Sequence, residues 1–178
     1  FKSDGTRLFV IGRSSSRVYQ YSVDSWKSNT ASYSGVFYSV SGQVPSPAGL
    51  RFSSAGDRMF LLSLTNRGLY QFSLTSPWDL STATNDGLVF SASRETLTAN
   101  AMTFASAGNK LYVMDTGRKL WEYDVASAWG LSVVSHGGVT ATLVDSGFST
   151  TNDIQIKGDG TKFWVIGGPT NISHIREY

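Results

Sequence analysis

The twelve-residue stretch FKSDGTRLFVIG (residues 1–12) recurs near the other end of the chain as IKGDGTKFWVIG (residues 156–167). Two further copies lie between them, FSSAGDRMFLLS (52–63) and FASAGNKLYVMD (104–115). The central glycines of the four copies are separated by 51, 52 and 52 residues. Four copies at a nearly constant interval indicate that the chain repeats one structural unit.

Other residue types keep the same phase as these glycines. An apolar residue lies four positions before each glycine, an aromatic residue lies four positions after it, and a tryptophan follows later in three copies. In chain order these residues are Phe1, Phe52, Phe104 and Ile156, then Phe9, Phe60, Tyr112 and Trp164, then Trp26, Trp78 and Trp129. Because large aromatic side chains are usually buried, we expect the tryptophans to pack between neighbouring units, near the third strand.

Each unit has the pattern of four short β-strands. In the third copy these are NAMTF (100–104), KLYVMD (110–115), KLWEYDV (119–125) and GVTAT (138–142). The first two strands are joined by a turn rich in residues that tolerate positive φ. The second strand is apolar on both faces, which is typical of a strand between two packed neighbours. Only the stretches around the three tryptophans are compatible with a short helical turn.

A period of about 50 residues with four strands per unit predicts an all-β fold, a β-propeller with four-stranded antiparallel blades. The blades are expected at residues 1–41, 42–93, 94–143 and 144–178, about three and a half in all, with AGLRF, NAMTF and NDIQI as innermost strands. An open array leaves apolar faces and strand edges exposed. Since both ends fall inside strands, we expect an excerpt of a larger ring, completed by further sequence or by another subunit. A minimal four-blade ring is the alternative.

Composition excludes several classes of function. The chain of 178 residues has a formal charge of +2, too small to predict nucleic-acid binding, and it has no cysteine. A disulfide framework, a thiolate nucleophile and a cysteine zinc site are therefore excluded. We expect no membrane span, because no long apolar run occurs, and no cofactor, because no nucleotide-binding glycine motif occurs.

The second copy, FSSAGDRMFLL…GLYQFSLTSPWDLSTAT (residues 52–84), resembles a β-propeller repeat of phage virion proteins and of surface proteins of environmental bacteria. Residues 69–84 match the repeat best, whereas the first and third copies lack its Pro and Asp around the tryptophan. The resemblance implies a propeller. In a phage it would imply a tail-fibre or receptor-binding role and an extracellular or virion location.

Few residues carry recognisable chemistry. His136 and His174 fall in different strand contexts and form no metal-ligand pair, so no metal site is expected. Asp153 replaces Gly49 and Ala101 on the innermost strand and is expected to face the central channel. Together with Glu95 and Asp145 it could hold a cation or act in acid–base catalysis, although a solvated channel carboxylate is the simpler interpretation.

The loops between second and third strands carry basic tips, on the face where ligands usually bind to propellers. The proposed ligand-binding residues are Arg13, Arg17, Asn66, Arg67, Thr116, Arg118, Lys119, Asn171 and His174. Such side chains suit an anionic or polyhydroxylated partner such as a surface glycan. A solvated surface is the alternative, since Arg7, Arg58, Lys110 and Lys162 recur equally regularly on the opposite face.

We therefore predict a non-enzymatic binding or structural module, in an assembly with other subunits or with the rest of a longer chain. Two alternatives remain open. A propeller hydrolase or lactonase would need acidic or histidine side chains at the channel mouth, where only Asp153 is expected. An intracellular protein-interaction scaffold has no distinguishing feature in this sequence.

Overall fold

The computed structural model describes residues 1–143, 150–168 and 174–178. In the described residues the chain is built almost entirely of antiparallel strands. The elements, in chain order, are β1 (Arg7–Gly12), β2 (Arg17–Asp24), β3 (Lys27–Ser39), β4 (Pro47–Phe52), β5 (Arg58–Ser63), β6 (Gly68–Leu74), the 3-10 turn η1 (Leu80–Thr82), β7 (Ala83–Ser91), β8 (Ala99–Ala105), the 3-10 turn η2 (Ser106–Gly108), β9 (Lys110–Asp115), β10 (Lys119–Ser127), β11 (Gly130–Thr142), β12 (Thr150–Ile156), β13 (Phe163–Gly168) and β14 (His174–Glu177).

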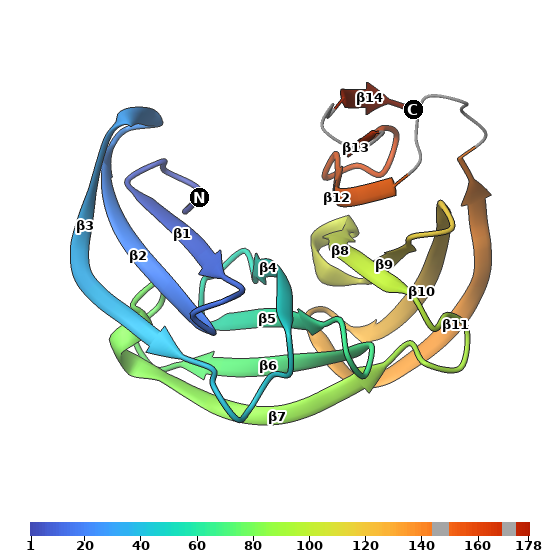
Figure 1. The fold of residues 1–178 in the computed structure, drawn as a ribbon, viewed down its shortest axis with the longest axis horizontal. Coiled ribbons are helices and arrows are strands. Elements are labelled where there is room, and N and C mark those ends of the chain that lie inside the picture. Colours follow the sequence, from blue (N-terminus) through green and yellow to red (C-terminus); the bar gives the residue numbers. More distant parts are fainter. Residues whose placement is uncertain (144–149, 169–173) are drawn as a thin grey trace.

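The strands form four sheets, each following the chain without a crossover: β1-β2-β3, β4-β5-β6-β7, β8-β9-β10-β11 and β12-β13-β14. We call them blades 1 to 4. They stand side by side around an open centre, with β4, β8 and β12 innermost and β3, β7 and β11 outside (Figure 1). This is the predicted all-β propeller arrangement, with complete four-stranded blades in the middle. In the described residues, β1 and β14 belong to separate sheets, so these sheets do not close a ring.

The repeated glycine allows a tryptophan to cover the turn between the first two strands of blades 2 and 3. Gly56 has φ +78°, and a Cβ built on it would overlap the indole ring of Trp78. The backbone N–H of Trp78 donates to the Gly56 carbonyl at 2.9 Å, and the backbone N–H of Trp129 donates to the Gly108 carbonyl at 3.0 Å. Glycine is therefore required here both for its backbone conformation and for the close approach of the ring.

Aromatic side chains from two blades meet at each interface. The ring of Phe9 in blade 1 lies 4.5 Å from that of Phe52 and 6.2 Å from that of Trp78, both in blade 2. Blades 2 and 3 repeat this contact through Phe60, Phe104 and Trp129, with the ring of Phe60 5.0 Å and 6.2 Å from the other two. The expectation that the tryptophans pack between blades is thus confirmed for Trp78 and Trp129. The side chain of Trp26, by contrast, is 56% exposed.

Arginine reinforces these interfaces from the same face. Arg7 donates through Nη1 to the carbonyl of Trp78 in the next blade, and Arg58 donates in the same way to Trp129 at 2.8 Å. Lys110 instead forms ion pairs with Glu122 and Asp124 of its own blade. Arg7 and Arg58 are each half-buried and join two blades, so the regular recurrence of basic residues on this face does not by itself indicate a solvated surface.

Of the three stretches around tryptophans that are compatible with a helical turn, only the one around Trp78 contains one. η1 follows Trp78, where Asp79 caps it by accepting a hydrogen bond from the Ser81 N–H at 3.0 Å. The stretches around Trp26 and Trp129 form turns between strands, and β11 begins at Gly130, well before the expected residue 138. No helix in the described part of the chain is long and apolar enough to cross a membrane.

Candidate functional site

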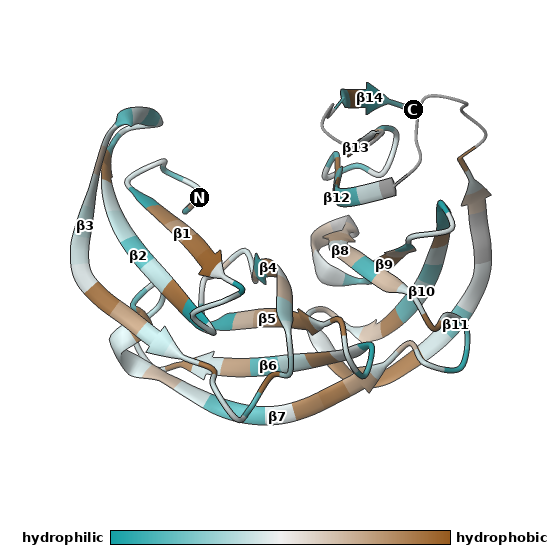
Figure 2. Ribbon diagram, in the orientation of Figure 1, coloured by the Kyte–Doolittle hydropathy of each residue, from teal (hydrophilic) through white to brown (hydrophobic). Residues whose placement is uncertain are grey.

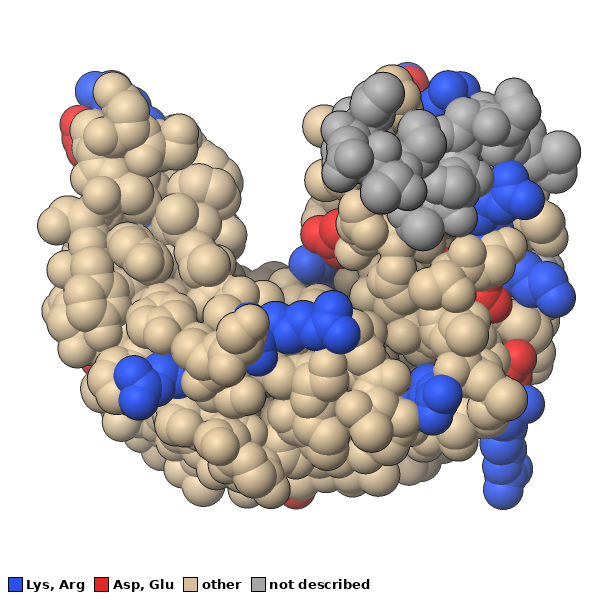
Figure 3. Space-filling view, in the orientation of Figure 1, with Lys and Arg blue, Asp and Glu red and all other residues tan. Residues whose placement is uncertain are grey.

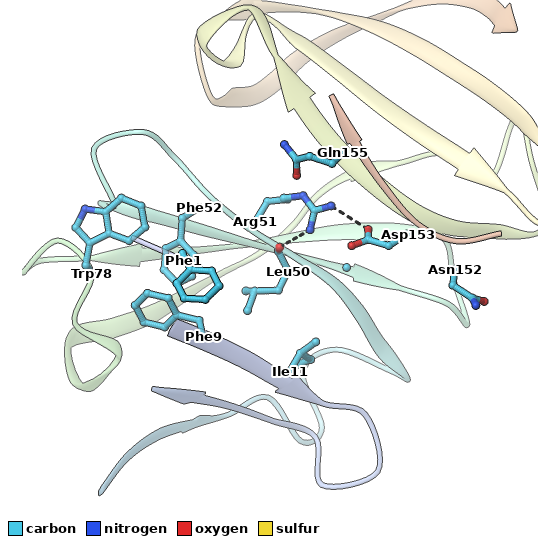
Figure 4. A pocket seen from close by; sticks show the side chains of 11 residues that line it. Phe1, Phe9, Ile11, Leu50, Arg51, Phe52, Trp78, Asn152, Asp153 and Gln155 are labelled. Carbon is cyan, nitrogen blue, oxygen red and sulfur yellow. Dashed lines mark hydrogen bonds and ion pairs between the residues drawn. The ribbon is translucent and has the colours of Figure 1, made fainter. Parts of the chain in front are cut away.

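A cavity of about 490 Å³ lies on the inner side of the array, where blades 1, 2 and 4 face one another (Figures 3 and 4). Its size is typical of a small-molecule site. Two kinds of side chain meet in it, an aromatic group from blades 1 and 2 and a polar group mainly from blade 4. The lining residues are Phe1, Phe9, Ile11, Gly49, Leu50, Arg51, Phe52, Trp78, Asn152, Asp153 and Gln155.

The aromatic side of the cavity is an extension of the interface between blades 1 and 2. Phe9 comes from β1, Phe52 ends β4, and Trp78 lies over the turn before β5. The rings of Phe52 and Trp78 stack with centroids 5.2 Å apart. Because these rings are fixed by the packing of two blades, they offer a ligand a rigid apolar surface.

The polar side is organised by Arg51, which the sequence analysis did not single out. Its Nη2 lies 2.9 Å from Asp153 Oδ1 and donates to the Ile154 carbonyl at 2.6 Å, while Nη1 donates to the Leu50 carbonyl at 2.8 Å (Figure 4). The guanidinium therefore bridges β4 and β12, which are two blades apart. The side chain of Arg51 is 19% exposed and that of Asp153 is 45% exposed.

Asp153 lines the cavity, where its carboxylate is partly exposed to solvent and is also held by hydrogen bonds. Its Oδ1 accepts from Arg51 and from the Ile154 N–H. Glu95, one of its proposed partners in a cation site, contacts the Tyr123 hydroxyl instead, and burial raises the pKa of this tyrosine. Asp145 lies outside the described residues. In the described part of the chain, no group of three His, Cys, Asp or Glu side chains is placed to hold a metal ion.

The internal repeat contains a signal that would have identified Arg51. Its counterparts on the innermost strands of blades 3 and 4 are Thr103 and Gln155, just as the counterparts of Asp153 are Gly49 and Ala101. Both charged residues therefore depart from the repeat at inner-strand positions. Such departures mark positions where the blades are not interchangeable.

A second groove, of about 430 Å³, lies at the face that carries the loops between second and third strands. It is lined by Arg13, Ala48, Leu64, Leu97, Thr98, Ala99, Asn100, Thr116 and Asn152. Asn152 lines both this groove and the central cavity, so the two are neighbours. Of the nine residues predicted to bind a ligand, the structure brings Arg13 and Thr116 together along this loop-face groove.

Other predicted ligand residues hold the loops themselves. Arg67 donates to the Leu97 carbonyl in the connection between blades 2 and 3, and to the Thr65 carbonyl, both at 2.6 Å. Asn66 accepts from the Gly68 N–H at 3.1 Å and donates to the Tyr70 hydroxyl at 2.7 Å. Arg17 lies over the ring of Phe37 at 4.3 Å from its centroid, a cation–π contact.

The remaining predicted residues are dispersed. Arg118 has φ +67° in the turn before β10, and the backbone N–H of Lys119 donates to Asp115 Oδ1 at 3.0 Å. His174 is exposed at the start of β14, and Asn171 lies outside the described residues. Neither Arg118, Lys119 nor His174 lines either of the two cavities.

Asp115 is a buried carboxylate that the sequence analysis did not identify. Only 5% of it is exposed, and its Oδ2 accepts from the Thr96 hydroxyl at 3.2 Å and from Trp121 Nε1 at 3.1 Å. These bonds tie the end of β9 to the preceding connection and to β10. Because its oxygens are already engaged, Asp115 serves the loop structure.

Comparisons with known proteins identify the fold. No protein-family model matches the chain, and no curated protein sequence matches it. Among solved structures, a candidate 6-phosphogluconolactonase from Bacteroides uniformis has a TM-score of 0.61 and 14% identity over 98% of this chain. The β-propeller domain of Cps50 (Swd1) from Myceliophteria thermophila has a TM-score of 0.53 and 14% identity over 99% of it.

A nidogen/laminin complex also matches, with a TM-score of 0.58 and 9% identity over 96% of this chain. The matched part is 50%, 51% and 56% of these three solved chains, so this chain spans about half of their length. At such low identity the likeness establishes the propeller architecture alone.

Proposed function

We propose that this chain is a non-enzymatic binding module whose central cavity holds a polyhydroxylated ligand such as a surface glycan. The observation that carries the proposal is the meeting of a fixed aromatic surface with several hydrogen-bonding side chains in one cavity (Figure 4). A sugar ring has a C–H face that suits Phe52 and Trp78, and hydroxyls that need both donors and acceptors.

The polar side chains match that requirement. The amides of Asn152 and Gln155 each supply a donor and an acceptor. Both hydrogen bonds that Asp153 forms with described residues go to Oδ1, so Oδ2 can accept from a ligand hydroxyl. Arg51 fixes Asp153 in place and offers a positive charge to any acidic substituent. The site is therefore prepared for binding before the ligand arrives.

The contacts of Asp153 favour a role in binding over a role in catalysis. A hydrolase needs a carboxylate that can gain or lose a proton or hold a metal ion. Here the carboxylate and Arg51 tether β4 to β12. The resemblance to virion and bacterial surface repeats supports a setting in which such a module is one part of a larger extracellular or virion assembly.

The proposal is tested by displaying bacterial O-polysaccharides on an array and applying the labelled chain, followed by calorimetric titration with the polysaccharide that binds. Asn152→Ala and Gln155→Ala should each weaken binding by about 2- to 10-fold, the effect of one lost hydrogen bond. Lys27→Ala is the matched control, because Lys27 is exposed at the start of β3 and does not line the cavity.

Two outcomes would overturn this assignment. If Arg13→Ala and Thr116→Ala weaken binding while Asn152→Ala and Gln155→Ala do not, the ligand occupies the loop-face groove. If the chain releases product from a lactone or a polysaccharide and Asp153→Asn abolishes that release, it is an enzyme.

A further inference from the structure

The contact that joins neighbouring blades has a donating half and a receiving half. The second strand of one blade supplies a basic residue and an aromatic ring, as Arg58 and Phe60 do in blade 2. The next blade supplies a tryptophan that packs on an aromatic residue near the end of the innermost strand, as Trp129 does on Phe104 with ring centroids 4.9 Å apart. The same module joins blades 1 and 2.

Blade 1 carries a receiving half that is not filled in the described part of the chain. The ring of Trp26 lies 5.4 Å from that of Phe1, and the backbone N–H of Trp26 donates to the Gly5 carbonyl at 3.0 Å. This reproduces the arrangement of Trp78 and Trp129. In blades 2 and 3 a ring from the preceding blade completes the cluster, whereas at blade 1 the side chain of Trp26 remains 56% exposed.

Blade 4 carries the matching donating half. Lys162 and Trp164 occupy the positions of Arg58 and Phe60 in the repeat. Both are at present held by Glu177, which pairs with Lys162 Nζ at 2.5 Å and accepts from Trp164 Nε1 at 3.1 Å. These side chains therefore lie on the sheet face that, in blades 1 and 2, contacts the next blade.

Apolar side chains next to these two halves are also more exposed than their counterparts in blade 2. Val10 in blade 1 is 41% exposed, although its counterpart Leu61 in blade 2 is fully buried. Ile166 in blade 4 is 38% exposed, although its counterpart Leu62 is also fully buried. Each counterpart is covered by a neighbouring blade. Apolar sheet faces of this kind are stabilised when another surface covers them. The two strands that carry these residues, β1 and β13, border the open side of the array (Figure 2).

We propose that a second copy of the chain covers both faces, head to tail, so that two half-rings form one closed ring. Trp164 of each copy would complete the aromatic cluster of Phe1 and Trp26 in its partner, and Lys162 would donate to the Trp26 carbonyl. Three of the matched structures support two copies, because this chain aligns over 96–99% of its length with only 50–56% of theirs. A contact between two different faces closes when the rotation it imposes completes a circle.

The oligomeric state of the 178-residue chain in solution tests the proposal. Light scattering coupled to gel filtration should give twice the monomer mass of 19.3 kDa, with the dimer fraction rising with protein concentration. Val10→Asp and Ile166→Asp should each give a monomer, because each substitution places a charge in both of the contacts between the two copies. Leu88→Asp is the control: Leu88 is also exposed, but it lies on the outer strand β7.

Mixing the two variants identifies the head-to-tail geometry. Val10→Asp leaves the blade 4 face intact, and Ile166→Asp leaves the blade 1 face intact. In a dimer of one variant with the other, one of the two contacts therefore joins unmodified faces, and an equimolar mixture should recover dimer. Should only one of the two variants affect the mass, a contact between identical faces would replace the proposal.

Hydrogen exchange of the unmodified chain gives an answer even if a variant fails to fold. Protection of β1 and β13 should increase with protein concentration while that of β5 stays constant. A chain that remains monomeric at all concentrations, with no change in β1 or β13, would show that these faces need further sequence or a different protein.

Discussion

At the scale of single residues, the repeat contains two kinds of glycine that look alike in the sequence. Gly56 and Gly35 have nearly the same positive φ, +78° and +79°. The space around Gly35 is open, whereas a side chain at Gly56 would meet the ring of Trp78. One glycine is required only for its backbone conformation, and the other is also required for packing.

This difference predicts unequal effects of alanine. Gly35→Ala should lower the free energy of unfolding by about 1 to 2 kcal/mol, the cost of a left-handed conformation for a residue with a Cβ. Gly56→Ala should cost more than that, because Trp78 must also move away from the turn and from Phe9. Urea denaturation of both variants and the unmodified chain would measure the difference. Equal losses would show that the indole ring does not cover the turn in solution.

At the scale of elements, one short turn owes its structure to a carboxylate. Asp79 caps η1, and its pKa lies below the ordinary value of 3.8 because the side chain and backbone of Ser81 donate to it. Leu80, the first residue of η1, is fully buried and its N–H donates to Gln20 Oε1 of blade 1 at 3.1 Å. The capped turn therefore also contributes to the contact between blades 1 and 2.

The lowered pKa of Asp79 predicts a pH-dependent effect. Asp79→Ala should reduce the free energy of unfolding by about 1 kcal/mol near neutral pH, where the cap is ionised. A carboxyl group with a lowered folded-state pKa stabilises above its unfolded value, and this stabilisation is lost as the pH falls through the folded value. The deficit of Asp79→Ala should therefore shrink as the pH is lowered below 3.8.

Asp79→Asn is the matched variant, since asparagine caps well but does not ionise. Thermal unfolding of the three proteins over a pH series measures the effect. A deficit of Asp79→Ala that stays constant across the series would mean that the ionised cap makes no special contribution.

At the scale of the whole molecule, the burial of apolar side chains differs among the blades. In β5 the four residues from Met59 to Leu62 are fully buried, because blade 2 has neighbours on both sides. In β14, Ile175 is 70% exposed, and its strand pairs only with β13 in the described structure. Local opening is easiest where few apolar contacts must be broken.

We therefore expect amide hydrogen exchange to rank the strands by their position in the array. At low protein concentration, β5 and β9 should exchange slowest, and β14 should exchange fastest. Mass-spectrometric exchange over a time series would measure this order. Uniform protection of all four blades would indicate that the chain unfolds only as one unit, and that the terminal blades are as well packed as the central ones.

The sequence alone determined the architecture, because each blade is built from contacts that recur with the repeat. The turn glycine, the strand aromatics and the tryptophan fulfil the same local role in every copy, so their spacing predicted the strands, the turns and the all-β propeller. Even the 3-10 turn η1 has a local cause, since only the second copy has an Asp after the tryptophan.

Only the tertiary structure decided the candidate site and the role of individual charges. Arg51 and Asp153 are 102 residues apart and meet because β4 and β12 face the same centre. Arg67 looked like a free loop tip, yet it holds a connection 30 residues away, and Arg58 reaches a carbonyl 71 residues away. A periodic pattern specifies what all copies share. The site depends on where the copies differ, and on which of those differences the curvature of the array brings together.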